Sequence, residues 1–378
     1  MRNPPVVPAG RLTALVVALA ALAGMGLPST ADAQGGAAGL RPRGPGEIGG
    51  KRIAAPSAMM LRRDAPPAPY NPADPSLAMD YNAVVNGVPL NGVGRLQTPV
   101  PGSPQFAFFC TAQRIGPRVL LTAAHCVTDE QTGDLLSTTG TSVTRFRGPG
   151  PDNTTAWYNV ETDFVRVRGS WQGFNNSETA LWQDVAIVRT KEVMPEWITT
   201  YSLFGGNPVG RATTNVGYGT FGGGTGPTGF DGRRRWGTND VEWLPDDPTF
   251  FGDRMLHTDF DSGTAQFDVF CLALDVCNRG STTEMGLGGG DSGGPLFIDG
   301  RIAGVASYGS YFCADARCTP YVADPSRPFD SFGSFHGFAP VADNRAWISQ
   351  VVPEPGTYAL LGTGLLALGA LARRRRTS

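Results

Sequence analysis

The chain has 378 residues, 17% of them charged, with 51 glycines and a formal net charge of -2 at pH 7. Few charges and many glycines favour a turn-rich, all-β protein over a helical one. The nearly balanced charge excludes the basic field that nucleic-acid binding needs, so we expect no nucleic-acid partner.

The first 33 residues have the pattern of a signal peptide. Arg2 and Arg11 precede an apolar run from Leu12 to Leu27, and Ala31-Asp32-Ala33 supplies the small residues of a signal-peptidase site. We therefore expect export, with signal peptidase as a partner. The alternative is a retained membrane anchor.

The next segment, residues 34–83, is rich in Pro, Gly, Ala and Arg and shows little periodicity. This composition predicts an extended pro-segment or disordered linker. From Val84 onward, short apolar or β-branched stretches alternate with Gly, Pro and Asn, without a long helical pattern, which predicts β-barrels. Asp299-Gly300 lies between two such stretches and predicts a hairpin.

A glycine-rich loop, Thr220–Gly232, is followed by Arg233-Arg234-Arg235-Trp236. A basic triplet beside an aromatic residue could contact nucleic acid, but we expect an exposed, cleavable surface loop in an exported acidic protein.

The C-terminal tail, residues 353–378, has three parts in order. Pro353-Glu354-Pro355 precedes an apolar run from Tyr358 to Ala372, and four arginines follow at 373–376. The run is somewhat short for a bilayer span. The tail resembles a PEP-CTERM sorting signal, which implies transient membrane contact, removal by an exosortase-type enzyme and delivery to the cell surface or extracellular matrix. The alternative is a single-pass anchor facing outward.

Three motifs carry the chemistry. Leu120–Cys126 contains His125, Asp184 opens the run Asp184–Val188, and Ser292 lies in Gly290–Pro295. Serine needs a neighbouring base to become a good nucleophile, and histidine suits that role near neutral pH. In this order the motifs resemble the trypsin/chymotrypsin family of serine endopeptidases.

The resemblance covers residues 84–352 and implies a fold. It implies two packed six-stranded antiparallel β-barrels, over about 84–204 and 205–340, with the site between them and a closing helix at 341–352.

The resemblance also assigns roles. His125 is the general base and later the general acid, Asp184 orients it, and Ser292 attacks the substrate carbonyl. The N–H groups of Gly290 and Ser292 form the oxyanion hole, and Ser307 hydrogen-bonds the catalytic acid. The alternative is a catalytically silent trypsin-fold protein that serves surface adhesion or matrix binding.

Activation by cleavage is a further expectation. Val84-Val85-Asn86-Gly87 is similar to the start of mature enzymes of the family, so a cut after Ala83 would let the Val84 ammonium pair with Asp291. Ala83 is not the basic residue that a tryptic activator prefers. Another protease cuts there, or the enzyme accepts small residues, or Asp291 is paired internally and no cut is needed.

The resemblance also implies a primary pocket for peptide or protein substrates, at positions counted from the serine motif. Its expected residues are Gly286, Ser307, Tyr308, Gly309 and Gly337. The pocket is expected to be open and uncharged, which favours apolar or aromatic side chains. Glu284, Asp315 or Asp330 could reach a rearranged pocket and restore a basic preference.

The six cysteines follow an export signal and therefore predict disulfides. By the family's spacing Cys110 pairs with Cys126, whereas Gly288 replaces a cysteine that the family usually has. The remaining pairs are expected to be Cys271 with Cys277 and Cys313 with Cys318. No metal or organic cofactor is expected. Asp246, Asp247 and Asp253 could form a calcium loop, but we expect them to be solvated acids of a surface loop. We expect a monomer.

Overall fold

The structure of the protein is a computed structural model. The described residues are 46–48, 51–53, 60–63, 84–100, 103–136, 143–149, 155–174, 180–230, 232–245, 254–277, 284–326, 328–352 and 363. The chain divides into two units, Met1–Gly36 and Ala37–Ser378. The predicted signal peptide, the loop with Asp246, Asp247 and Asp253, and all of the tail after 352 except residue 363 lie outside the described residues.

The first six-stranded sheet is a closed antiparallel barrel in the order β10-β11-β8-β7-β6-β9. Its strands are β6 (Val93–Val100), β7 (Ser103–Gly116), β8 (Val119–Thr122), β9 (Val143–Pro149), β10 (Thr155–Val167) and β11 (Ala186–Thr190). Leu96, Leu120 and Val188 are fully buried in its interior, as β-branched and aliphatic side chains on a pleated strand predict.

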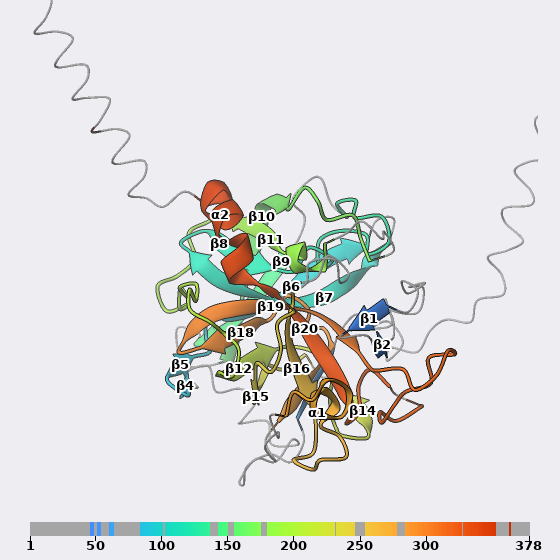
Figure 1. Cartoon of the computed structure of the whole chain (residues 1–378). Helices are drawn as coiled ribbons and strands as arrows, with labels where there is room; N and C mark the ends of the chain where they lie inside the picture. The colour runs from blue at the N-terminus through green and yellow to red at the C-terminus, as the bar shows by residue number, and fades with distance from the viewer. Residues whose placement is uncertain are drawn as a thin grey trace, which may run out of the picture. The chain divides into compact units, whose positions relative to one another are not determined.

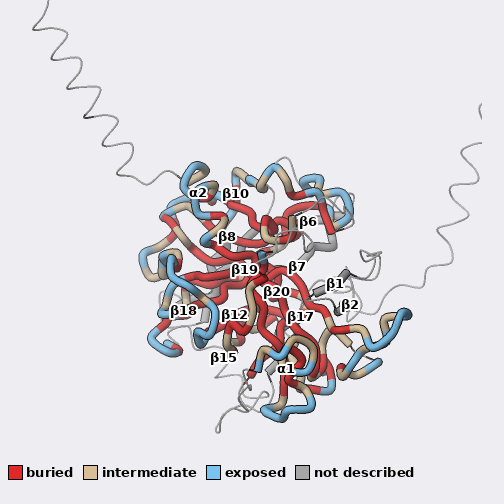
Figure 2. The backbone as a smooth tube through the Cα atoms, viewed as in Figure 1, coloured by how far each residue is buried: buried red, intermediate tan, exposed pale blue. Residues whose placement is uncertain are grey.

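The second six-stranded sheet has the order β15-β12-β18-β19-β20-β16 (Figure 1). Its strands are β12 (Ala212–Gly217), β15 (Arg235–Asp240), β16 (Leu256–Phe260), β18 (Pro295–Ile298), β19 (Arg301–Ser310) and β20 (Ser334–Pro340). The helix α2 (Val341–Val351) follows β20 directly. Figure 2 shows buried residues concentrated along the strands of both sheets. The predicted all-β fold class with a short C-terminal helix is confirmed; the second sheet is an ordered row of strands, whereas the first closes completely.

The predicted hairpin at Asp299-Gly300 joins β18 to β19. Both residues have positive φ, 49° and 72°, which is the backbone of the tight turns that Asp-Gly favours. The hairpin extends the chain from the serine motif back across the second sheet.

The segment before Val84 contains regular structure that its composition did not predict. It forms β1 (Gly46–Ile48), β2 (Lys51–Ile53) and β3 (Met60–Arg63). β3 pairs antiparallel with β17 (Met285–Gly289), the strand that leads into the serine motif. Short strands completed by a distant partner carry little local signal, which is why composition alone missed them.

The arginine triplet is also less exposed than predicted. The preceding loop forms a hairpin of β13 (Phe221–Gly223) and β14 (Gly226–Gly229). Arg234 and Arg235 are buried; the guanidinium of Arg235 lies 4.1 Å from the ring centre of Phe221. Stacking on an aromatic face lets arginine be buried with its charge retained.

Four elements remain: the hairpin of β4 (Val84–Val85) and β5 (Val88–Pro89), a 3₁₀ turn at Leu181–Gln183, and α1 (Val269–Leu274). Within the described ranges, no helix has the length and apolar character needed to span a membrane.

Candidate active site

His125 and Asp184 meet at the ends of two paired strands. His125 follows β8 and Asp184 precedes β11, and the pairing of Thr122 with Ala186 places both residues at the same edge of the barrel. Asp184 Oδ2 lies 2.7 Å from His125 Nδ1, and its Oδ1 accepts the His125 backbone N–H at 2.9 Å. Both side chains are buried. Since a carboxylate oxygen only accepts, Nδ1 carries the proton and Nε2 keeps its lone pair.

The second sheet supplies a third donor to the same carboxylate. Ser307 Oγ on β19 donates to Asp184 Oδ2 at 2.6 Å. Asp184 is therefore held by its histidine partner and by a residue of the opposite sheet. Such a set of charge-assisted bonds fixes both the position and the orientation of the imidazole.

Aromatic rings and acids surround the imidazole. The ring centres of Phe174 and Trp171 lie 5.2 and 6.5 Å from that of His125. Burial lowers the pKa of His125, but the charge and hydrogen bond of Asp184 and the charge of Glu130 outweigh it, so the pKa lies above the ordinary 6.5. The pKa of Glu130 is also raised, and burial is the largest cause.

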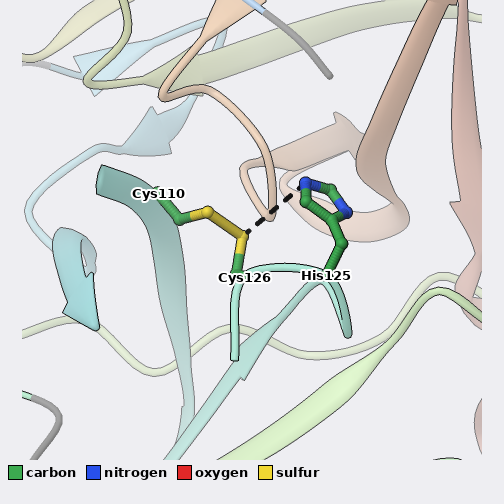
Figure 3. A group of neighbouring side chains, drawn as sticks. All are labelled: Cys110, His125 and Cys126. Atoms are coloured by element: carbon green, nitrogen blue, oxygen red, sulfur yellow. Dashed lines mark hydrogen bonds between the residues drawn. A yellow bond between two sulfur atoms is a disulfide. The ribbon is translucent and has the colours of Figure 1, made fainter. Parts of the chain in front are cut away.

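The disulfide of Cys110 and Cys126 lies directly beside the histidine. It ties β7 to the turn that carries His125, and Cys126 Sγ is 4.0 Å from His125 Nε2 (Figure 3). These three residues are close enough to surround a metal ion. Because the sulfurs are bonded to each other, they are not thiolates, and this group does not fit a metal centre.

The serine turn is fixed to both sheets. Thr111 of β7 donates its N–H to Ser292 O and its hydroxyl to Gly290 O, each at 2.8 Å. Gly293 N donates to Ala306 O of β19 at 2.8 Å. The turn therefore lies where the two sheets meet.

Two glycines allow this turn. Gly290 and Gly293 have φ of 107° and 81°, a region that disfavours side chains. At Gly293 a Cβ would lie 2.1 Å from Thr122 Oγ1, so the serine turn packs closely against the end of β8. Within the described residues, the N–H groups of Gly290 and Ser292 have no acceptor. They are the two groups that sequence predicted for the oxyanion hole.

Ser292 and His125 are both buried at this junction, but no hydrogen bond joins Ser292 Oγ to Nε2 among the described residues. Hydrogen bonds of this type are often long in ligand-free enzymes and tighten when substrate binds.

Asp291 is fully buried and bonded to backbone. Its oxygens accept the N–H groups of Gly219 at 2.8 Å and Gly288 at 3.1 Å. Burial raises its pKa well above the ordinary value, while the Gly219 bond and the charge of Arg235 act in the opposite direction. Val84 is 61% exposed and pairs with Pro89, so the predicted pair of Val84 with Asp291 is not formed in the uncut chain.

The predicted pocket residues come together, but around packed rings. Ser307, Tyr308 and Gly309 lie on β19 opposite Gly337 of β20. A Cβ at Gly337 would lie 2.4 Å from the Tyr308 ring. At Gly286 it would lie 2.7 Å from His336 and 2.9 Å from Phe260. The small residues accommodate these rings, so the expected opening on their side-chain faces is filled.

Three acids, Glu284, Asp315 and Asp330, are the sequence-based candidates for giving the pocket a basic preference. Glu284 Oε2 accepts the N–H of Asp261 at 2.8 Å in a buried position. Asp315 binds the backbone of Arg317 in its own exposed loop, and Asp330 is half-buried. A pocket of about 250 Å³ lies at the start of α2, lined by Leu244, Leu256 and Ala303 among others, and its lining does not include His125, Asp184 or Ser292.

The cysteines are joined as Cys110–Cys126, Cys271–Cys277 and Cys313–Cys318, the three pairs that the sequence predicts. The last two close short loops of the second half of the chain, at the end of α1 and after β19.

Comparison with known proteins identifies the tail. The PEP-CTERM protein-sorting motif matches residues 351–376, which confirms the predicted signal and indicates export with surface or membrane anchoring. Curated protein sequences give no match.

Solved structures with a similar backbone include neuropsin, a serine protease expressed in the limbic system of mouse brain. Its sequence is 15% identical to this chain, the match covers 72% of this chain and 97% of neuropsin, and the TM-score is 0.42. HL collagenase has 19% identity, coverage of 71% and 96%, and a TM-score of 0.43. Human heparin binding protein has 16% identity, coverage of 70% and 93%, and a TM-score of 0.41.

Proposed function

We propose that this chain is an exported serine endopeptidase that hydrolyses peptide bonds through Ser292, His125 and Asp184. One observation carries the proposal: buried Asp184 accepts hydrogen bonds from His125 Nδ1, His125 N and Ser307 Oγ. This arrangement holds an imidazole in one tautomer with Nε2 available as a base, beside a serine on a strained glycine turn.

The reaction follows from these positions. Ser292 Oγ attacks the carbonyl carbon while His125 Nε2 takes its proton. The carbon–nitrogen bond then breaks as Nε2 returns that proton to the leaving amine, which leaves an acyl-enzyme. A water molecule attacks the ester by the same proton route and frees Ser292.

The oxyanion that forms in each step needs donors. The N–H groups of Gly290 and Ser292 have no acceptor within the described part of the chain, so they are ready to bind it. One donor of this kind contributes about 3 kcal/mol to the transition state.

Activation belongs to the same proposal. Exposed Val84 lies in a hairpin next to the predicted cut after Ala83, and Asp291 is a buried acid held by backbone N–H groups. A new ammonium group at Val84 would offer Asp291 a cationic partner and reorganise the serine turn. If Asp291 keeps its backbone partners in the active enzyme, no cut is required.

The substrate preference proposed is for apolar or aromatic side chains, because Gly286 carries no charge and the rings of Phe260 and Tyr308, which lie against Gly286 and Gly337, are apolar. Rapid cleavage of arginine substrates with none of phenylalanine or leucine substrates would contradict this preference.

A second function, a silent trypsin-fold protein that binds surfaces or matrix, has its own support. His125 is buried under Phe174, and rings fill the faces of Gly286 and Gly337. These features fit a fold kept for binding rather than turnover.

Covalent labelling separates the two functions. A hydroxyl-directed inhibitor is expected to label Ser292 in the exported protein, with labelling lost in Ser292→Ala. Ser310→Ala, a buried serine on β19, is the matched control and should keep the label. If the wild type neither labels nor cleaves peptides faster than Ser292→Ala, whose expected loss is roughly 10⁶-fold in turnover, the binding function stands instead.

A further inference from the structure

Three acidic side chains converge inside the second half of the molecule, away from the triad. Glu242 follows β15, Asp259 is on β16, and Glu284 immediately precedes β17. One carboxylate oxygen from each of the three lies within 4.8 Å of the other two. Their exposed fractions are 4%, 0% and 2%, so solvent does not screen them.

The described surroundings leave much of this charge without a donor. Asp261 N donates to Glu284 Oε2 at 2.8 Å, and Val269 N to Asp259 Oδ2 at 3.1 Å. Both oxygens of Glu242 and Asp259 Oδ1 accept no hydrogen bond from an N–H or O–H group of the described residues. The carboxyl groups of Glu242 and Asp259 lie within hydrogen-bonding reach of each other, so buried Glu242 faces another acid in the cluster and not a donor.

The neighbouring charges have the same sign. Asp261 and Asp268 add two further carboxylates close to the cluster, and none of the ion pairs between described residues includes Glu242, Asp259 or Glu284. Buried carboxylates without a compensating cation are strongly unfavourable. The cluster therefore calls for a positive occupant.

We propose that Glu242, Asp259 and Glu284 bind a divalent cation, Ca²⁺, in the exported protein. Ca²⁺ takes oxygen ligands at about 2.3–2.6 Å, so ligands on opposite sides of the ion are about 5 Å apart, which agrees with the spacing of the three carboxylates. Mg²⁺ binds oxygen at about 2.0–2.1 Å and keeps several waters, so it fits this spacing less well. Zn²⁺ prefers nitrogen and sulfur ligands, which the three acids do not supply.

The ion would join three elements that position the nucleophile turn. Glu284 leads directly into β17, which ends just before the serine motif, and the Asp259 carboxylate also accepts the first N–H of α1. The side-chain Nδ2 of Asn239 on β15 donates to the backbone oxygens of Asp259 and Met285. This side chain therefore already links β15 to β16 and β17. A bound cation would therefore stabilise the support of β17 without touching the triad.

Protons are the competing occupant. The pKa of Glu284 is raised to about 11, first by burial and then by the neighbouring acids Asp259 and Asp261. In the absence of an ion, the cluster therefore takes up protons. A glutamine at position 242 imitates a protonated carboxyl group but is a poorer ligand. Glu242→Gln therefore separates the two occupants.

The test uses the full exported protein, stripped with a chelator and titrated with CaCl₂ or MgCl₂ during thermal unfolding and calorimetry. We expect one Ca²⁺ per chain and a rise in Tm of several degrees at saturation, with a smaller effect of Mg²⁺. Glu242→Gln and Asp259→Asn should each weaken Ca²⁺ binding at least tenfold. Glu192→Gln, an exposed acid of the first half, should bind as the wild type does.

Two results overturn the proposal. One is a stripped wild type whose Tm and heat of mixing do not respond to millimolar Ca²⁺, which assigns the cluster to protons. The other is Ca²⁺ binding that survives Glu242→Gln but is lost in Asp253→Asn, which assigns the ion to the neighbouring acidic loop. If the cluster variants do not fold, the wild-type titration and Asp253→Asn still decide between these outcomes. Neither result depends on peptidase activity.

Discussion

At the scale of single residues, Ser307 tests how the second sheet contributes to the triad. Its hydroxyl is one of three donors to buried Asp184. A hydrogen bond to a charged group contributes about 1.5–3 kcal/mol, so Ser307→Ala should lower kcat/KM roughly 10- to 100-fold, mostly in kcat. Steady-state peptide hydrolysis measures this loss. Ser310→Ala, on the same strand, should change little; an equal loss in both variants would mean that only the strand was damaged.

The environment of His125 predicts the acid limb of the pH profile. Burial disfavours its charged form, but Asp184 and Glu130 together raise the pKa above 6.5. Since the general base must be neutral, kcat/KM should rise through a pH above 6.5. Glu130→Gln removes a charge that favours the imidazolium, so the limb should move to lower pH. Asp134→Asn, exposed in the same loop, is the control, and a limb that stays in place in Glu130→Gln would refute the role of that charge.

The same pKa shift has a stability consequence. A histidine whose folded pKa exceeds its unfolded pKa stabilises the fold below the unfolded value and loses this contribution as pH rises through the folded value. The free energy of unfolding should therefore contain a His125 contribution that fades above about pH 6.5.

Single residues also show why catalytic candidates could be proposed from sequence, whereas the packing of the predicted pocket could not. His125, Asp184 and Ser292 each lie in a contiguous motif, so their neighbours in sequence mark them as candidates. The faces of Gly286 and Gly337 are filled by His336 and Tyr308, which depends on strand pairing between distant segments. A glycine in the sequence does not show whether the space beside its Cα is open or is filled by an aromatic ring.

At the scale of elements, β3 makes the segment before Val84 part of the site's support. Its backbone pairs Arg62 with Gly286 and Met60 with Gly288. Deleting residues 34–63 should free β17 and speed amide exchange there, because its strand partner is lost. Deleting only residues 34–53 retains β3 and is the matched control. Equal exchange rates of β17 in both proteins would show that β3 contributes nothing to its protection.

Element boundaries were predictable where the local signal was strong. The Asp299-Gly300 hairpin follows from turn chemistry, and the helix beginning at Val341 was implied by the family resemblance. β3 and the buried Arg235 did not follow, because a three- or four-residue strand and a stacked guanidinium are stabilised by partners far away in the chain.

At the scale of the whole molecule, the proposed active site requires both sheets to be folded. The serine turn is bonded to Thr111 of the first sheet and Ala306 of the second, and Asp184 of the first sheet is bonded to Ser307 of the second. The arrangement of His125, Asp184 and Ser292 therefore depends on contacts between the two sheets. Neither sheet alone supplies all of these contacts.

The sorting motif at 351–376 yields a prediction for the complete exported chain. With one tag before Pro353 and another after Arg376, the mature protein in its native host should keep the first tag and lose the second. We expect the apolar run and the four arginines to hold the tail in the membrane while the Pro353-Glu354-Pro355 region is cut. Glu354→Ala should retain both tags if that region is recognised. Co-migration of both tags on the mature wild-type protein in membrane fractions would instead establish a permanent single-pass anchor, because an anchor requires the apolar run to stay attached to the folded sheets.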